Sequence, residues 1–196
     1  MNSIREQLFE LQTAQLDHDE LFHKEITRLS IHQRLNHMAL HFAKYSGNFC
    51  DCILNNSNDQ ILKKSIIDSF IISITCANIL NVRLSDKLIA AEEQAYSSLS
   101  DLGHDIARRM EIDTQDPMWL IKTFPVASGT FAKACESVDH LESYLYRESL
   151  IDSALSICSL MLIAASYLEI DLLSEVPLRL NNVKKKSIFF DYYKNH

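Results

Sequence analysis

The segments SIIDSFIISITCANIL (residues 65–80) and SLIDSALSICSLMLIAASYL (residues 149–168) decide the fold of this chain. Each opens with a similar aspartate motif and continues as an apolar run with the periodicity of a helix. A helix that is apolar on most of its surface must be covered by other helices. The 196 residues include only three glycines and three prolines, too few for the turns of a β protein. We therefore predict an all-α helical bundle, with residues 1–196 forming a single domain.

The two apolar segments belong to a longer internal similarity. Three pairs of segments match in the same order: SIIDS (65–69) with SLIDS (149–153), SGNFCDC (46–52) with SGTFAKA (128–134), and ILNVRL (79–84) with YLEIDL (167–172). The offsets differ by a few residues, as expected where loops between helices take insertions. The pattern predicts a helical unit duplicated in tandem, with repeats at about residues 34–96 and 118–187, preceded by N-terminal helices.

Local signals place several helix ends in the N-terminal part of the chain. The apolar periodicity predicts one helix over residues 3–16 and another from about Asp19. Ser30 and Gln33 fit a capping box at the start of IHQRLNHMALHFAKY, residues 31–45. We therefore expect a long helix to begin directly after Ser30.

Further breaks are expected later in the chain. The polar segment NNSND (residues 55–59) predicts a loop, and Asp116 followed by Pro117 is typical of a helix start. Pro125 is expected to end that helix, because proline disrupts a helix interior. Residues 97–116 are polar and mixed in sequence, so they are the predicted connector between the two halves.

Charge and composition exclude some classes of protein. The net charge of −7 and the pI near 5.6 argue against general nucleic-acid binding. The local basic run at residues 184–186 suits a solvated last helical turn. No basic-then-apolar leader occurs in residues 1–12, so we expect a cytoplasmic protein whose five cysteines are reduced. The longest apolar stretch, residues 154–168, is shorter than the ~20 residues of a membrane span, so no membrane partner is expected.

Small polar residues accompany the aspartate on each apolar helix. Helical spacing places Thr75 and Asn78 on one stripe with Asp68, and Ser156 on one stripe with Asp152. If the two helices pack together, both carboxylates are expected inside the bundle, where they must be paired or bound to a metal. Two interpretations stay open: acids of a first helical turn, stabilised by the helix dipole, or ligands of Mg²⁺, which prefers carboxylate and water oxygens.

The second repeat carries more acidic side chains near its aspartate. Glu136, Asp139 and His140 follow one another at helical spacing, and Glu148 lies one turn before Asp152. The candidate Mg²⁺ ligands are therefore Asp152, Glu148, Glu136 and Asp68. A solvated helix face is the alternative explanation of the same pattern.

This arrangement resembles the MazG-like all-α nucleotide pyrophosphohydrolase family. Its members carry a Glu-Glu-x-x-Glu element on one helix, and the next helix opens with Glu-x-x-Asp, runs apolar and ends in a Leu-Gly-Ile-Asp-Leu-like turn. Here LHFAKYSGNF (residues 40–49) takes the place of the acidic element, and the two apolar segments resemble the second helix and its turn. LLSEVPLRLNNVKKK (residues 172–186) resembles the third helix. The resemblance covers residues 40–186 as two copies.

The chain departs from the family at most of its acidic positions. Other residues stand where the family has glutamates: Lys44, Tyr45 and Asn48 in the first copy, Val126, Ala127 and Thr130 in the second, and Ser65 and Ser149 in the two Glu-x-x-Asp motifs. Only Asp68 and Asp152 match directly. Because family members hold Mg²⁺ with several carboxylates, the resemblance implies a degenerate tandem-repeat member whose catalysis is weak or absent.

The activity that the resemblance implies is Mg²⁺-dependent cleavage of a nucleoside triphosphate to the monophosphate and pyrophosphate. The alternative is a bundle of the same origin that binds a nucleotide or a protein without turnover. In the family the catalytic bundle commonly assembles from separate subunits. Duplication would let one chain supply both halves, and a homodimer stays open.

A third interpretation starts from the histidines. GHD, residues 103–105, is similar to the HD element of metal phosphohydrolases, with His37 or His41 upstream and Asp152 downstream. His37 and His41 are also four residues apart, a spacing that can hold a metal on one helix face. Histidines on a polar helix face explain the same spacing without a metal.

Overall fold

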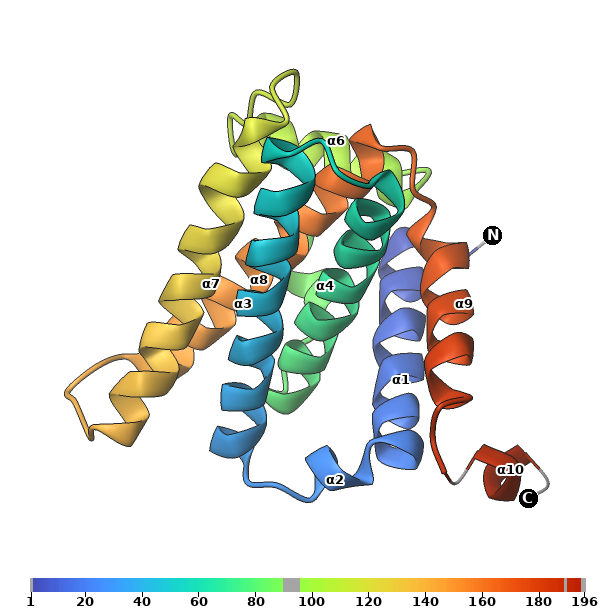
Figure 1. Ribbon diagram of the computed structural model, residues 1–196, viewed down its shortest axis with the longest axis vertical. Coiled ribbons are helices and arrows are strands. Elements are labelled where there is room, and N and C mark those ends of the chain that lie inside the picture. Colours follow the sequence, from blue (N-terminus) through green and yellow to red (C-terminus); the bar gives the residue numbers. More distant parts are fainter. Residues whose placement is uncertain (1, 90–95, 189, 195–196) are drawn as a thin grey trace.

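The structure is a computed structural model that describes residues 2–89, 96–188 and 190–194. Its helices are α1 (Ile4–Phe22), α2 (Lys24–Thr27), α3 (Ile31–Leu54), α4 (Asp59–Ile79), α5 (Leu84–Leu88), α6 (Leu99–Arg109), α7 (Met118–Asp139), α8 (Tyr146–Tyr167), α9 (Leu172–Lys184) and α10 (Phe190–Lys194). Within these ranges every regular element is a helix (Figure 1). The predicted all-α bundle is confirmed.

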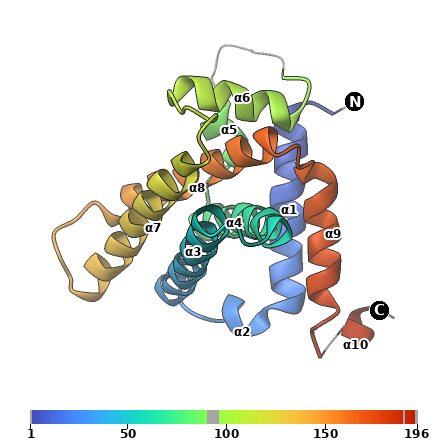
Figure 2. The ribbon, with the colours of Figure 1, turned by 45° about the horizontal axis from the view of Figure 1, so that its top comes forward.

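Four long helices form the centre of the molecule. α3 packs against α4 and α7, and α8 packs against α7 and α4. α1 and α9 lie side by side and cover a further part of α4, while α6 crosses over α8 (Figure 2). The two helices predicted to be central, α4 and α8, are therefore packed against each other, each surrounded by other helices.

The core is built from the apolar faces of these helices. Both α4 and α8 bury most of their apolar side chains. Between α3 and α7, four fully buried phenylalanine rings make edge-to-face contacts. Phe42 lies 5.3 Å from Phe131 and Phe49 lies 4.8 Å from Phe124, measured between ring centroids. Such pairs each add about 0.5–1.5 kcal/mol beyond the burial of their area.

Several predicted helix ends are confirmed. Ser30 caps α3 through a capping box with Gln33, and α7 begins directly after Pro117, with the Asp116 carboxylate accepting the Met118 N–H at 2.9 Å. α4 and α8 also end alike, since Asn81 and Glu169 both have positive φ, 54° and 53°. This similarity agrees with a tandem duplication, which itself stays a prediction.

Three expectations about helix ends are wrong. α1 continues through Asp19 to Phe22. Pro125 lies inside α7, which runs from Met118 to Asp139 without a break. An interior proline costs about 3 kcal/mol, but Phe124 and Phe131 anchor both sides of it in the core, and their burial outweighs that cost. The expected connector, residues 97–116, contains α6, which packs on α8.

The first-turn interpretation of the two aspartates is also wrong. Asp68 lies midway along α4, which begins at Asp59, and Asp152 lies in the second turn of α8, which begins at Tyr146. Neither carboxylate therefore occupies the position at which a helix dipole stabilises an acid most.

α8 is the one helix of the described ranges that is long and apolar enough to cross a membrane, with a mean hydropathy of 1.7 over 18 residues. Of that window, 72% is buried inside the protein, where α8 contacts α4, α6 and α7. A core helix meets the same criteria of length and composition. The position of α8 at the centre of the bundle explains its apolar sequence.

α6 approaches α8 so closely at Gly103 that a side chain does not fit. A methyl group there would lie 2.5 Å from the carbonyl oxygen of Leu162 and would collide with the Ser166 hydroxyl. Gly47 in α3 and Gly129 in α7 have open space around the same position. Gly47 and Gly129 are therefore suitable controls for a substitution at Gly103.

We predict that Gly103→Ala lowers the free energy of unfolding by about 1–3 kcal/mol, because α6 must move away from α8. Gly129→Ala should instead raise it by up to about 1 kcal/mol, since alanine is the better helix former. Urea denaturation of the two variants and the wild type measures both effects. A Gly103→Ala variant as stable as Gly129→Ala would contradict the close contact.

Candidate functional site

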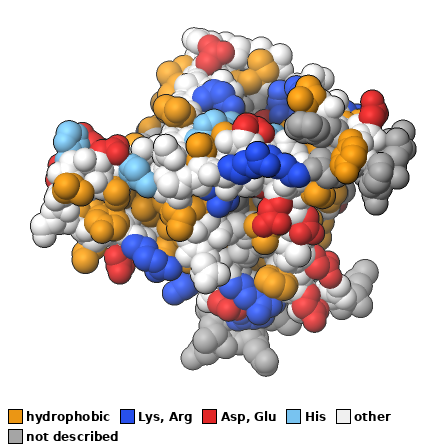
Figure 3. Space-filling model, turned by 90° about the horizontal axis from the view of Figure 1, so that it is seen from below, with side chains coloured by type: hydrophobic (Ala, Val, Ile, Leu, Met, Phe, Trp, Pro, Cys, Tyr) orange, Lys and Arg blue, Asp and Glu red, His pale blue; other side chains and the backbone are white. Residues whose placement is uncertain are grey.

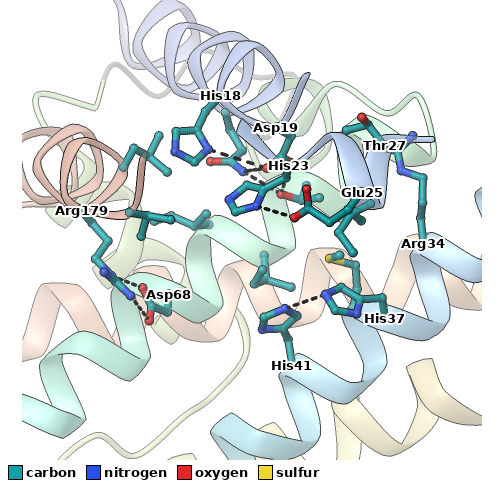
Figure 4. A pocket seen from close by; sticks show the side chains of 18 of the residues that line it. His18, Asp19, His23, Glu25, Thr27, Arg34, His37, His41, Asp68 and Arg179 are labelled. Carbon is teal, nitrogen blue, oxygen red and sulfur yellow. Dashed lines mark hydrogen bonds and ion pairs between the residues drawn. The ribbon is translucent and has the colours of Figure 1, made fainter. Parts of the chain in front are cut away.

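The candidate site is a cavity of about 470 Å³. Side chains from α1, α3, α4 and α9 form its walls, and residues of α2 close one end (Figure 4). It is lined by Gln15, His18, Asp19, His23, Glu25, Ile26, Thr27, Arg34, His37, Met38, His41, Lys44, Tyr45, Asp68, Ile71, Ile72, Thr75, Arg179, Leu180 and Val183. Histidines, cations and carboxylates are thus concentrated around one space.

The polar stripe predicted on α4 forms one wall and holds α1 and α9 in place. Asp68 accepts two hydrogen bonds from Arg179 of α9, at 2.6 Å and 3.0 Å. Thr75 donates to Asp19 of α1 at 3.0 Å, and the Asn78 amide donates to the Gln12 carbonyl of the same helix at 3.0 Å. All three residues of the stripe therefore bind neighbouring helices.

The ion pair between Asp68 and Arg179 is largely shielded from solvent. The two side chains are 13% and 21% exposed. Hydrogen bonding to Asp68 raises the pKa of Arg179 further above its usual value. Because both oxygens of Asp68 are engaged by the guanidinium, this carboxylate is already neutralised by a cation.

The opposite wall is a face of α3 that carries basic residues at helical spacing. Lys44 donates to Nδ1 of His41 at 3.3 Å, and Nε2 of His41 lies 3.2 Å from Nε2 of His37. Since the ammonium group only donates, His41 accepts at Nδ1 and donates from Nε2 to His37. Burial, and then the charge of Lys44, lower the pKa of His41 to about 4. His41 is therefore neutral at pH 7.

A third group lies at the C-terminal end of α1. His18 and Asp19 are both buried or nearly so, and Nδ1 of His18 lies 3.9 Å from Oδ1 of Asp19. His23, directly after α1, brings its own ring nitrogen into the same cluster, and the three ligand atoms lie within 4.8 Å of one another. Figure 4 shows this cluster across the cavity from His37 and His41.

The acceptors and the donors of the cavity are satisfied to different degrees. Asp68 is bound by Arg179, Asp19 by Gln15 and Thr75, and Glu25 contacts His23 at 3.3 Å. Two cations of the α3 face, by contrast, form no ion pair in the described part of the chain, and the Asp68 carboxylate acts on Lys44 only through space. Arg34 has a buried Nε without a hydrogen-bond partner, and Lys44 contacts His41 and the Tyr45 ring. The α3 face of the cavity can therefore donate hydrogen bonds to an anion.

The other candidate Mg²⁺ ligands lie outside this cavity. Asp152 is exposed and lines a separate cavity of about 340 Å³ with Lys87 and Arg109. Glu148 is exposed on α8, and Glu136 is exposed on α7, 3.0 Å from the ammonium of Lys133. α4 and α8 do pack together, but the stripe of Asp68 faces α1 and α9 while Asp152 faces α5 and α6. The expectation that both carboxylates meet inside the bundle is wrong.

The residues of the HD interpretation also lie apart. His104 packs edge-to-face on Tyr167, with 4.7 Å between ring centroids. Asp105 is bound by Tyr96 at 2.7 Å and by Arg109 at 3.0 Å. Neither His104 nor Asp105 lines the cavity that contains His37 and His41. His104 and Asp105 of the GHD motif therefore make local contacts of α6 and are not parts of one metal site with His37 and His41.

Two parts of the site were not anticipated from the sequence. The cluster at the end of α1 had a usable signal, since Asp19 and His23 are four residues apart in DHDELFH, residues 17–23. Arg179 had none, because it lies 111 residues from its partner Asp68. The sequence does indicate His37, His41 and Asp68 as candidate ligands, although not as parts of one cavity.

The surface charge is mixed on the face that Figure 3 shows. Lys and Arg side chains alternate there with Asp, Glu, His and hydrophobic ones. Nucleic-acid binding requires a predominantly basic surface, which this face does not provide.

No model of a known protein family, no curated protein and no solved structure matches the chain. The chemistry of the cavity itself therefore carries the functional inference.

We predict that Arg179→Ala lowers the free energy of unfolding by about 2–3 kcal/mol, because it leaves the shielded Asp68 carboxylate without its partner. Lys63→Ala is the matched control, since Lys63 makes a more exposed ion pair with Glu175 that also joins α4 to α9. That variant should lose less than about 1 kcal/mol. Chemical denaturation measures both, and equal losses would show that the Asp68 pair has no special role.

We also predict that stability falls as the pH is lowered from about 6.5 towards 4. The folded pKa of His41 is about 4, below the usual histidine pKa of 6.5, so in this window the unfolded chain binds the extra proton. After allowance for solvent screening, the contribution is on the order of 1 kcal/mol at pH 5. Urea denaturation at pH 7 and pH 5 should show a smaller loss for His41→Gln than for the wild type. An identical loss would mean that His41 is protonated normally.

Proposed function

We propose that the protein is a MazG-like helical bundle that binds a phosphorylated small molecule of the nucleotide class in the cavity between α1, α3, α4 and α9. One observation carries the proposal. Arg34 and Lys44 face a cavity whose carboxylates are already engaged, so an anionic ligand is what the remaining donors fit. Lysine and arginine are the common phosphate ligands of proteins.

The size and the lining of the cavity support a ligand of this class. Its volume of about 470 Å³ lies within the range of about 300–1,000 Å³ for small-molecule sites. Met38, Ile71 and Ile72 provide an apolar surface for a planar base, while the histidines and Tyr45 provide polar groups. A nucleotide combines these two requirements in one molecule.

Binding without turnover is favoured over pyrophosphohydrolysis. Mg²⁺ dehydrates reluctantly and is usually held by carboxylates together with substrate phosphates. Asp68 is paired with Arg179, and Asp152 lines a different cavity. Hydrolysis with Mg²⁺ remains the second candidate, because Asp68, the family's motif aspartate in the first copy, does line the cavity.

We predict that calorimetric titration with a panel of ribo- and deoxyribonucleoside mono-, di- and triphosphates gives binding that does not require Mg²⁺. Lys44→Ala and Arg34→Ala should each weaken it at least tenfold, the loss of one charge-assisted hydrogen bond. Lys122→Ala is the control, because Lys122 is an exposed lysine of α7 outside the cavity. Binding that is unchanged in both cavity variants would contradict the proposal.

A pyrophosphate-release assay on the same nucleotides separates the two candidates. The binding proposal expects no release with Mg²⁺. Release that is lost in Asp68→Ala but retained in Asp152→Ala would instead support catalysis in this cavity. Release that is lost in Asp152→Ala would support the second repeat and overturn the assignment of the cavity.

A further inference from the structure

His18 is a buried polar side chain without a hydrogen-bond partner. Its side chain is 6% exposed, and within the described ranges neither Nδ1 nor Nε2 has a hydrogen-bond partner. A buried polar group left in this state costs about 1–3 kcal/mol. His18 lines the cavity and lies against Asp19. A ligand in the cavity that binds one of its nitrogens would remove this cost.

Two further groups with lone pairs lie beside this imidazole. The ligand atoms of His18, Asp19 and His23 all lie within 4.8 Å of one another. A tetrahedral site with bonds of about 2.0–2.1 Å separates its ligand atoms by roughly 3.4 Å. Nδ1 of His18 and Oδ1 of Asp19 are 3.9 Å apart, so a movement of a fraction of an ångström brings them to that separation.

The surrounding residues orient Asp19 and His23. Gln15 donates to Oδ1 of Asp19 at 2.9 Å, and Thr75 donates to Oδ2 at 3.0 Å. Nδ1 of His23 lies 3.3 Å from the Glu25 carboxylate, which leaves Nε2 of His23 for another partner. Carboxylate and hydroxyl groups that fix metal-binding side chains in this way are a regular part of metal sites.

We propose that His18, Asp19 and His23 form a binding site for a transition-metal dication such as Zn²⁺. Two imidazoles and one carboxylate suit Zn²⁺, Co²⁺ or Fe²⁺, whereas Mg²⁺ prefers oxygen ligands alone. Three protein ligands leave a further coordination position for water or a ligand oxygen, as in catalytic zinc sites. The three residues line the candidate cavity, so this position is accessible from it.

The site does not depend on the proposed nucleotide ligand. Anion binding was assigned to Arg34 and Lys44 on α3, whereas the metal ligands come from the end of α1 (Figure 4). Each function can therefore fail without the other. Where both hold, the dication adds positive charge to a cavity that already donates hydrogen bonds to an anion.

The test is titration of the metal-free chain, without an affinity tag, with Zn²⁺ and separately with Co²⁺, whose absorption reports the ligand set. The wild type should bind one equivalent that excess Mg²⁺ does not displace. His23→Ala and Asp19→Asn should weaken binding at least tenfold, and Thr75→Val should weaken it less. His104→Ala is the control, because His104 lies outside the cavity on α6.

His18→Phe separates a metal ligand from a residue that only packs. The aromatic ring fills the same space and removes the unpartnered nitrogens, so the metal-free variant should melt at or above the temperature of the wild type. Zn²⁺ should raise the melting temperature of the wild type and of His104→Ala, but not that of His18→Phe. A Zn²⁺ shift that is equal in all three proteins would overturn the proposal, as would Zn²⁺ binding that His23→Ala leaves unchanged.

Discussion

The burial of α4 and α8 is the constraint on which the rest of the structure depends. Both helices are apolar on most sides, so each is stable only when other helices surround it. They satisfy part of this requirement by packing on each other, and α3, α7, α1, α9 and α6 satisfy the remainder. Gly103 shows how closely α8 is covered, since the α6 backbone approaches α8 there so closely that no side chain fits.

The polar stripe on α4 explains why one of these apolar helices carries an aspartate. Asp68, Thr75 and Asn78 are the points at which α9 and α1 are attached through hydrogen bonds. Asp68 and Thr75 also line the candidate cavity. A uniformly apolar α4 could pack against α1 and α9 in many registers, whereas paired polar groups select one. Asp68 thus has a structural role that is complete without a metal.

The cavity combines two kinds of chemistry on opposite walls. The α3 wall presents cations and histidines, and the end of α1 presents two imidazoles and a carboxylate. Histidine is neutral or charged near physiological pH according to its surroundings, and His41 is held neutral by burial and by Lys44. On the wall that faces the α1 cluster, His41 therefore acts as a neutral hydrogen-bonding group, and Lys44 and Arg34 carry positive charge.

The sequence by itself determined the helical class, the two core helices and ends such as the capping box at Ser30, because periodicity and capping depend on residues that are close along the chain. It did not determine that Pro125 stays within α7, since the burial of Phe124 and Phe131 decides that. It also could not pair Asp68 with Arg179, 111 residues away, or place Asp152 in another cavity. Only the tertiary structure decided which helices cover α4 and α8. That arrangement sets the direction in which each polar stripe faces, and therefore which side chains meet in the candidate cavity.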